Sequence, residues 1–259
     1  MTASPFDLPA SPVDIAVARL LQARRESRAM AAPTLPDAAA AYAVQDAVAL
    51  ELGWFGASGP RHWKSGGASR KAVLTHAPLP PAGVWQSAAD ARGWSFATRG
   101  IEAEIALRLS EPVDAGRAAA LDVAGARKLV EGFCVSIEIV DSRWLEANEA
   151  PPLAKLADLQ SHGALVLGNW LPFVDRDWPA QVCRVDITGQ AVKVFRGTHS
   201  MADPVYVVPA WLRHATRHGA VVPAGTVVTT GTWCGLLTAL PGDEVQVTFD
   251  GLGHAAITL

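Results

Sequence analysis

The chain has 259 residues, is 50% hydrophobic and carries a formal net charge of −3 at pH 7. Such a chain can bury a substantial core and is not disordered. No basic cluster indicates nucleic acid as a partner, and no polybasic amphipathic stretch indicates a membrane surface. No apolar run is long enough to cross a bilayer, and the N-terminus lacks a signal-peptide pattern, so we expect a cytoplasmic protein. The three cysteines are odd in number and widely spaced, which favours reduced thiols.

The N-terminal part, residues 1–55, is predicted to be helical. Ser11-Pro12-Val13-Asp14 is typical of a helix start, with a Ser cap, Pro at the first position and an acid in the first turn. This helix is expected to reach about Met30. A second, alanine-rich helix is expected to follow Pro36-Asp37 and to end at Gly53.

The middle of the chain is predicted to alternate between strands, loops and one helix. The expected segments are a loop or edge segment 53–67, loops and short extended pieces 78–100, a strand 101–109, a helix at about 122–131, a strand 133–140, an irregular or partly helical stretch 141–156 and a short strand 164–167.

The last third is predicted to be rich in strands. The expected segments are a hairpin 181–195, a helix 210–217 that starts at either Pro204 or Pro209, a strand 227–232 and a hairpin 245–259. Two helices followed mostly by strands predict an α+β fold. Because no linker or internal repeat divides the sequence, we expect a single domain over residues 1–259.

Glu102 and Glu104 stand one residue apart in the strand predicted over 101–109. Strand side chains alternate between faces, so both glutamates point to the same side, about 6.5–7 Å apart. Glu138 lies in a similar strand-like run. Three carboxylates on neighbouring strands could converge on one hard divalent cation such as Mg²⁺ or Mn²⁺. The alternative is an ordinary strand with a solvated face.

A site of this kind would also need a positive charge. Three monodentate carboxylates leave three octahedral positions open, two for a 2-oxo acid and one for water, and give the loaded site a charge of about −1. Such a charge repels an anionic substrate, so a nearby cation is required. Lys64, in a glycine-rich segment where the backbone can approach a ligand closely, is the candidate, and the alternative is a surface lysine.

Several motifs in order resemble the fumarylacetoacetate hydrolase superfamily. The resemblance is closest to the branch of 2-keto-4-pentenoate hydratases and 4-oxalocrotonate decarboxylases, and it covers roughly residues 12–259. The segments that carry it are Trp63-Lys64-Ser65-Gly66, Pro80 to Trp85, Ile101-Glu102-Ala103-Glu104-Ile105-Ala106, Ile137 to Arg143, Asp203-Pro204 with Ala210-Trp211-Leu212, Val222 to Thr232 and Pro241-Gly242-Asp243.

The resemblance implies a mixed β-roll with flanking helices, of the fumarylacetoacetate hydrolase C-terminal type. It also implies a homo-oligomer that acts on small 2-oxo or 2-hydroxydienoic acids from aromatic catabolism, with a pathway decarboxylase or hydratase as a further candidate partner. The implied metal ligands for Mg²⁺ or Mn²⁺ are Glu102, Glu104 and Glu138. The implied catalytic residues are Lys64 and Asp158, and the implied substrate-binding residues are Ser161 and Thr232.

The sequence leaves the reaction open. Our first expectation is a hydratase that adds water to a 2-hydroxy-2,4-dienoate to give a 4-hydroxy-2-oxo acid. A decarboxylase of the 4-oxalocrotonate type would share the same dienolate, and a catalytically weak partner subunit is a third possibility. Leu159 stands where the family has Asn, near the expected substrate pocket, which leaves the substrate undecided. Hydrolytic C–C cleavage would require a His–Glu pair, which the sequence alone does not locate.

Overall fold

The computed structural model describes residues 10–259. The α-helices in this range are α1 Pro12–Glu26, α2 Ala38–Glu51, α3 Ala115–Ala120, α4 Val123–Leu129, α5 Pro152–Ala157 and α6 Val208–Ala215. Short 3-10 helices are Pro81–Gly83, Ala147–Glu149, Trp178–Ala180 and Pro204–Val207. The strands are β1 His62–Gly66, β2 Thr75–Pro78, β3 Val84–Gln86, β4 Ala89–Asp90, β5 Gly100–Leu109, β6 Val130–Val140, β7 His162–Leu167, β8 Leu171–Pro172, β9 Val182–Ile187, β10 Lys193–Arg196, β11 Val227–Thr229, β12 Leu237–Thr238, β13 Glu244–Phe249 and β14 Gly253–Thr258.

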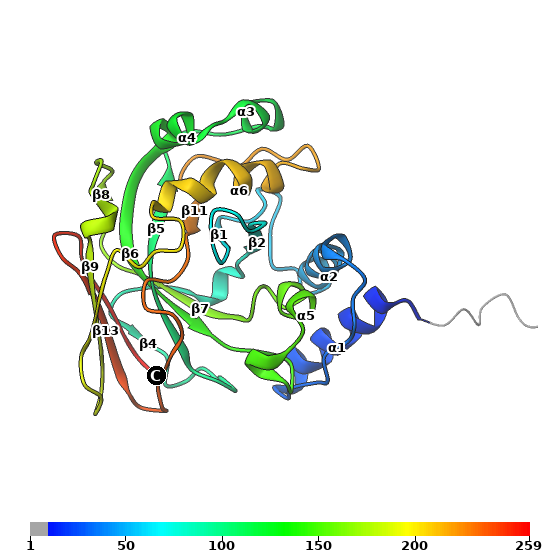
Figure 1. Cartoon of the computed structure of the whole chain (residues 1–259). Helices are drawn as coiled ribbons and strands as arrows, with labels where there is room; N and C mark the ends of the chain where they lie inside the picture. The colour runs from blue at the N-terminus through cyan, green and yellow to red at the C-terminus, as the bar shows by residue number, and fades with distance from the viewer. Residues whose placement is uncertain (1–9) are drawn as a thin grey trace, which may run out of the picture.

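The strands form two curved sheets, with the helices outside them (Figure 1). The larger sheet has the order β2-β1-β11-β5-β6-β7-β3, with β12 paired to β5 and β8 paired to β6. The smaller sheet has the order β10-β9-β13-β14-β4, and its strands β13 and β14 pack against β6. Curled sheets with few helices confirm the predicted α+β class.

Strands β5 and β6 are the long central pair of the larger sheet. They run antiparallel, and in their register Glu102 lies directly opposite Glu138. Ile101 and Ile139 on these strands are completely buried, and so are Glu104 and Glu138 apart from a 1% exposure of Glu104. The alternative of a solvated strand face is therefore wrong for Glu104 and Glu138, whereas Glu102 is half-buried.

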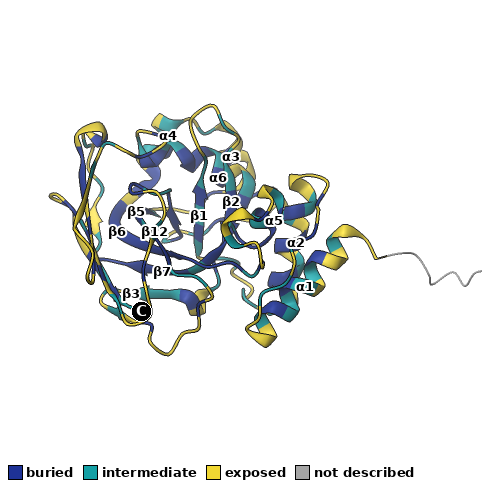
Figure 2. Ribbon diagram, turned by 60° about the horizontal axis from the view of Figure 1, so that its bottom comes forward, coloured by how far each residue is buried: buried dark blue, intermediate teal, exposed yellow. Residues whose placement is uncertain are grey.

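A second apolar cluster joins α1, α2 and α5 beside the larger sheet. Leu20 of α1, Val44 of α2 and Trp144 ahead of α5 are among its buried members. Exposed residues follow the outer sides of these helices (Figure 2). Both helices predicted in the N-terminal part are present, and residues 1–9 of that part lie outside the described residues. The assignment of residues 1–259 to one domain stays a prediction.

Helix α1 begins where the sequence predicts and ends about a turn earlier. The Ser11 hydroxyl accepts a hydrogen bond from the Asp14 backbone, and the Asp14 carboxylate accepts one from Ser11 in return. At the other end Ser27 has a left-handed backbone with φ of 49°. Met30, expected to be helical, instead donates from its backbone N–H to the Arg143 carbonyl at 2.9 Å. Pairing with a distant segment thus overrides the local helical preference.

Most other boundaries fall within a few residues of the prediction. Both predicted hairpins are present, as β9–β10 and β13–β14. The undecided helix start resolves into a 3-10 turn from Pro204 that continues as α6 from Val208. The segment predicted as loop or edge contains β1, which pairs with both β2 and β11. The short helix α3, capped by Asp114, was not predicted.

Two predicted boundaries are wrong, for identifiable reasons. The helix expected to reach residue 131 ends at Leu129, because β6 begins at Val130 to pair with the last residue of β5. The strand expected over 227–232 ends at Thr229, and Gly231 beyond it has φ of 106°, a conformation that favours glycine.

No helix within residues 10–259 is long and apolar enough to cross a membrane. The cysteines Cys134, Cys183 and Cys234 are all buried and free, as expected for reduced thiols.

Candidate metal centre

Three carboxylates meet at the centre of the larger sheet. Glu102 and Glu104 project from β5, and Glu138 projects from β6. One oxygen of each lies within 4.8 Å of the others. The β5–β6 register produces this convergence, since it places Glu138 opposite Glu102 and Glu104 two residues further along the same face.

The cluster is electrostatically unfavourable without a cation. Burial, together with the charge of Glu138, raises the pKa of both Glu102 and Glu104. The Thr229 hydroxyl of β11 donates a hydrogen bond to Glu104, which partly offsets this effect. Like charges confined in this way favour either protonation or a bound cation.

Glu138 is held from two sides. Lys64 of β1 donates from Nζ to Glu138 Oε1 at 2.5 Å, and His162 Nδ1 of β7 lies 3.0 Å from the same oxygen. Burial alone would raise the pKa of Glu138, but the Lys64 ammonium and His162 outweigh it and hold that pKa below its usual value. The other carboxylate oxygen, Oε2, is buried and has no hydrogen-bond partner within residues 10–259.

These residues fit a divalent cation. The unpartnered Glu138 Oε2 and the raised pKa values of Glu102 and Glu104 are what a missing positive charge would leave behind. Burial opposes the charge of Lys64, yet the three carboxylates raise the pKa of Lys64 overall, so the ammonium stays charged. With Lys64 counted, the cluster carries about −2, which one Mg²⁺ or Mn²⁺ would neutralise.

A cavity of about 390 Å³ opens over the cluster, and we call it the acidic cavity. Its lining includes Lys64, Glu102, Glu104, Ser161 and Thr232, so the structure brings these predicted site residues together. Ser161 Oγ is buried without a hydrogen-bond partner in the described part of the chain. Thr232 Oγ1 donates to the Gly235 carbonyl at 2.9 Å. Ser161 is thus the side chain more available to a ligand.

Ser161 ends a strained turn. Leu159, Gln160 and Ser161 have φ of 53°, 57° and 59°, three successive left-handed residues without a glycine. Such residues cost about 1–2 kcal/mol each and cluster at functional sites. The turn aims the Gln160 carbonyl at Lys64 Nζ, 3.3 Å away. Leu159, which stands in place of Asn, is itself buried and is not among the residues that line the acidic cavity.

Asp158 lies next to this turn but outside the acidic cavity. Its side chain is completely buried, with Oδ1 accepting from Arg143 Nε at 2.6 Å and Oδ2 from the Arg143 backbone at 2.9 Å. Arg24 Nη2 of α1 lies 3.3 Å from Oδ1. Both oxygens are therefore engaged, and the catalytic role implied for Asp158 stays a prediction.

The structure also contains contacts that the sequence analysis missed. His162 begins β7 and His199 lies in a loop, and both are buried. His162 contacts Glu138 because a bulge in the β6–β7 pairing shifts its register, a long-range feature without a local signal. The role of Thr229 depends in the same way on the pairing of β11 with β5.

Comparison with known proteins places this arrangement in a family. The family model described as fumarylacetoacetate (FAA) hydrolase C-terminal matches residues 62–259. The chain is 30% identical over 166 residues to 2-keto-4-pentenoate hydratase 1 from Dechloromonas aromatica (strain RCB), and 27% identical over 157 residues to 4-oxalocrotonate decarboxylase from Pseudomonas putida. Each match takes in 60% of this chain and 58% of the relative, so it spans less than two thirds of the relative's length.

Solved structures show the same fold over a longer stretch. 4-Oxalocrotonate decarboxylase from Pseudomonas putida G7, complexed with magnesium and adipate, aligns with a TM-score of 0.81 at 19% identity. That alignment covers 97% of this chain and 98% of the decarboxylase chain. On the family-model match and this shared fold, the chain belongs to the fumarylacetoacetate hydrolase C-terminal family.

Proposed function

We propose that this protein is a metal-dependent hydratase that adds water to a 2-hydroxy-2,4-dienoate to give a 4-hydroxy-2-oxo acid in aromatic catabolism. The observation that carries the proposal is the meeting of three carboxylates with Lys64 at one small cavity. The 30% identity to a 2-keto-4-pentenoate hydratase supports the choice of reaction.

Glu102, Glu104 and Glu138 are the proposed ligands of Mg²⁺ or Mn²⁺. The bound dication would act as a Lewis acid on the substrate's 2-oxygen and favour the negative charge that develops there. The chain's own side chains supply the rest of the site. Burial of Glu104 and Glu138 keeps bulk water away from their oxygens, and His162 fixes the orientation of the Glu138 carboxylate.

Lys64 is the proposed catalytic residue. Its ammonium lies between Glu138 Oε1 and the Gln160 carbonyl, so its direction is fixed by two acceptors. From there it can attract the substrate carboxylate and pass a proton to or from the substrate carbon chain. Ser161 Oγ, which lacks a partner within residues 10–259, would donate to the substrate, and Thr232 would contact the substrate from the cavity lining.

Decarboxylation of a 4-oxalocrotonate-type acid is the second candidate. A dicarboxylate needs a second cation, and Lys155 also lines the acidic cavity, with Nζ donating to the Asn148 carbonyl at 3.0 Å. The 27% identity to a decarboxylase agrees with this alternative. The third possibility, a weak partner subunit, has less support, since the three glutamates and Lys64 are brought together.

Hydrolytic C–C cleavage is less well supported. The His–Glu pair that it needs would have to be His162 with Glu138. That carboxylate already contacts Lys64 and belongs to the glutamate cluster, and His162 lines a different cavity. The pair therefore suits support of the cluster better than activation of water.

A UV assay of 2-hydroxypenta-2,4-dienoate tests the proposal directly. We expect the dienol absorbance to fall with Mg²⁺ or Mn²⁺ and not with EDTA, and 4-hydroxy-2-oxopentanoate to be the product. If the protein does not turn over the dienoate but releases CO₂ from 4-oxalocrotonate, the proposed reaction is decarboxylation instead of hydration. If neither acid is turned over, even with a partner enzyme added, the remaining hypothesis is a catalytically weak partner subunit. The homo-oligomer and the cytoplasmic location stay predictions.

A further inference from the structure

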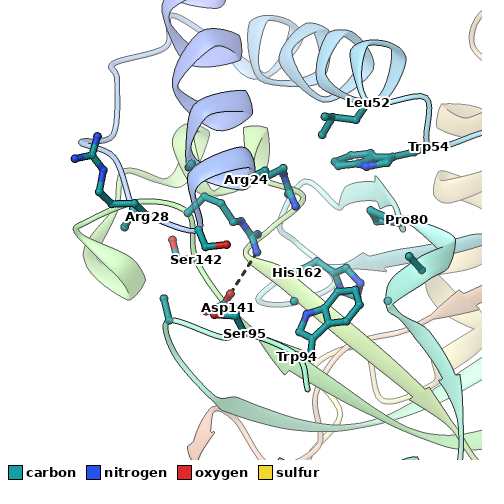
Figure 3. A pocket seen from close by; sticks show the side chains of 18 of the residues that line it. Arg24, Arg28, Leu52, Trp54, Pro80, Trp94, Ser95, Asp141, Ser142 and His162 are labelled. Atoms are coloured by element: carbon teal, nitrogen blue, oxygen red, sulfur yellow. Dashed lines mark ion pairs between the residues drawn. The ribbon is translucent and has the colours of Figure 1, made fainter. Parts of the chain in front are cut away.

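A second cavity, of about 570 Å³, opens beside His162 (Figure 3). Ser161 lines the acidic cavity, whereas His162 lines this one. Its walls come from α1, from the segment after α2, from residues 80–83 and 94–97 and from the chain after β6. We call it the arginine cavity, after Arg24, Arg28 and Arg143 in its lining. The proposed reaction makes no use of it.

The arginine cavity holds a buried donor without a partner. Arg24 and Arg143 share the carboxylate of Asp158, Asp141 Oδ2 lies 3.8 Å from Arg143 Nη1, and Arg28 pairs with Glu26, so the charges are balanced. Burial, and then the charge of Arg143, lowers the pKa of Arg24 to about 9, so Arg24 remains protonated at neutral pH. Arg24 Nε is buried with no hydrogen-bond partner in the described chain. A carboxylate would satisfy this donor with a charge-assisted hydrogen bond.

Flat apolar surfaces flank this charged end. The guanidinium of Arg24 lies 4.8 Å from the centre of the Trp54 ring, and Trp94 stands on another wall with 39% of its surface exposed. Leu52 and Pro80 add to the apolar lining (Figure 3). Aromatic walls beside a cation suit a small ring that carries an acid.

His162 supplies the remaining polar atom. Nδ1 faces a Glu138 oxygen, which can only accept, so Nδ1 carries the hydrogen. Nε2 is buried and unpartnered among residues 10–259, and in the neutral ring it is an acceptor. A ligand that satisfies Nε2 of that neutral ring brings an O–H or N–H group.

We propose that the arginine cavity binds a small aromatic carboxylic acid that carries a hydroxyl group. The carboxylate pairs with Arg24, the ring lies along Trp54 and Trp94, and the hydroxyl donates to His162 Nε2. This site is separate from the acidic cavity, and its existence does not depend on the proposed hydratase reaction.

One consequence does depend on the metal proposal. His162 supports Glu138 through Nδ1, so a ligand that holds the ring through Nε2 also fixes the support of a proposed metal ligand. By thermodynamic linkage the acid and Mn²⁺ then change each other's affinity by the same factor.

Isothermal titration calorimetry of metal-free protein in EDTA tests the site. The probes are 3-hydroxybenzoate and 4-hydroxybenzoate, with benzoate lacking the hydroxyl and phenol lacking the carboxylate. We expect saturable binding of at least one hydroxybenzoate and at least tenfold weaker binding of benzoate and phenol. No saturable heat from any probe overturns the proposal, and equal binding of benzoate overturns the role of His162.

Variants locate the binding. Ala97→Trp fills the arginine cavity, and Arg24→Gln removes its cation; each should weaken binding at least tenfold. Ala119→Trp, at an exposed position of α3, and Glu104→Gln, in the acidic cavity, should leave it unchanged. Loss of binding in Glu104→Gln but not in Ala97→Trp would place the acid in the acidic cavity and overturn the proposal. Arg24→Gln could fail to fold because Arg24 pairs with Asp158, so Ala97→Trp is the deciding variant.

The linkage needs a separate titration. Mn²⁺ is titrated with and without saturating 4-hydroxybenzoate, and the acid with and without Mn²⁺. Equal shifts of the two dissociation constants support the coupling, whereas no shift overturns it. Because the first titrations contain no metal, failure of the metal proposal and failure of the second site give different results.

Discussion

The two cavities differ in what their buried polar groups lack, although neighbouring residues, Ser161 and His162, line one each. In the acidic cavity three glutamates and Lys64 leave an excess of negative charge. In the arginine cavity the arginines have carboxylate partners, but Arg24 Nε has no acceptor among residues 10–259. A buried charge or donor without a matching partner is costly, so its presence indicates a partner that arrives from solution. The comparison therefore predicts a cation for the acidic cavity and a hydrogen-bond acceptor for the arginine cavity.

The largest expected effect comes from Glu104→Gln in the acidic cavity. The change removes one proposed ligand and one buried charge. We expect Mn²⁺ affinity to fall at least about 100-fold and dienoate turnover about 1,000-fold. Metal-free stability should not fall, because repulsion by Glu138 is removed. Calorimetry with Mn²⁺ and thermal unfolding in EDTA measure the two effects.

Glu131→Gln is the matched control. Glu131 lies on the same strand as Glu138, but its side chain is 41% exposed and pairs with Arg108. It should leave Mn²⁺ affinity unchanged. Equal Mn²⁺ binding by Glu104→Gln and the unmodified protein would end the metal assignment.

The acidic cavity was foreseeable from the sequence because its signal is local. Two glutamates at a spacing of two in an alternating segment must share a strand face. Their meeting with Glu138 required the β5–β6 register, which the sequence did not give. The arginine cavity has no such signal, since Arg24, Trp54, Trp94 and His162 come from four distant segments. Long-range pairing determines both the position of His162 and the early end of α1 at Ser27.

Asp158→Asn tests the charge balance on the other side. Asp158 is the one carboxylate shared by Arg24 and Arg143, and its side chain is completely buried. Removing its charge should cost about 3 kcal/mol of unfolding free energy, which corresponds to a Tm lower by about 6–12 °C. Asp175→Asn, in an ion pair where the aspartate is 78% exposed, should cost less than about 1 kcal/mol.

The same variant distinguishes a structural from a catalytic Asp158. Differential scanning calorimetry gives the Tm, and the dienoate assay gives kcat. An unchanged Tm with a large loss of kcat would support the catalytic role expected for Asp158, and the ion-pair interpretation would then fail.

Lys64→Met should have different effects on the binding of the Mn²⁺ cation and on the use of the anionic substrate. Nζ lies 2.5 Å from Glu138 Oε1, and its loss removes both the substrate's positive partner and the proposed proton carrier. We expect kcat/KM to fall about 100-fold. Mn²⁺ affinity should be equal or higher, because a positive charge next to the dication is removed. Lys71→Met, at an exposed lysine in the turn after β1, is the control for both measurements. A loss of Mn²⁺ affinity in Lys64→Met alone would show that Lys64 holds the cluster together instead.

The smallest expected effect is a pH dependence of stability from His76, a buried histidine behind the acidic cavity. His76 Nδ1 lies 2.9 Å from the hydroxyl of Ser65, which lines that cavity. Burial, and then Arg217 and Arg213, lowers the pKa of His76 to about 4 from its usual 6.5. The unfolded chain therefore binds more protons between these values, and stability present above pH 6.5 is lost as the pH falls toward 4. From pH 8 to pH 5 the loss from His76 is about 2 kcal/mol.

Urea unfolding of His76→Gln at pH 8 and pH 5 measures this contribution. The variant should be less stable than the unmodified protein at pH 8, and the difference should shrink by about 2 kcal/mol at pH 5, because Gln takes up no proton. His218→Gln, at a side chain that is 73% exposed, should keep the full pH dependence. Parallel curves for all three proteins would show that the pKa of His76 is not lowered in the fold. His76 would then become positively charged as the pH falls below about 6.5, and the excess of negative charge that favours a cation in the acidic cavity would shrink with it.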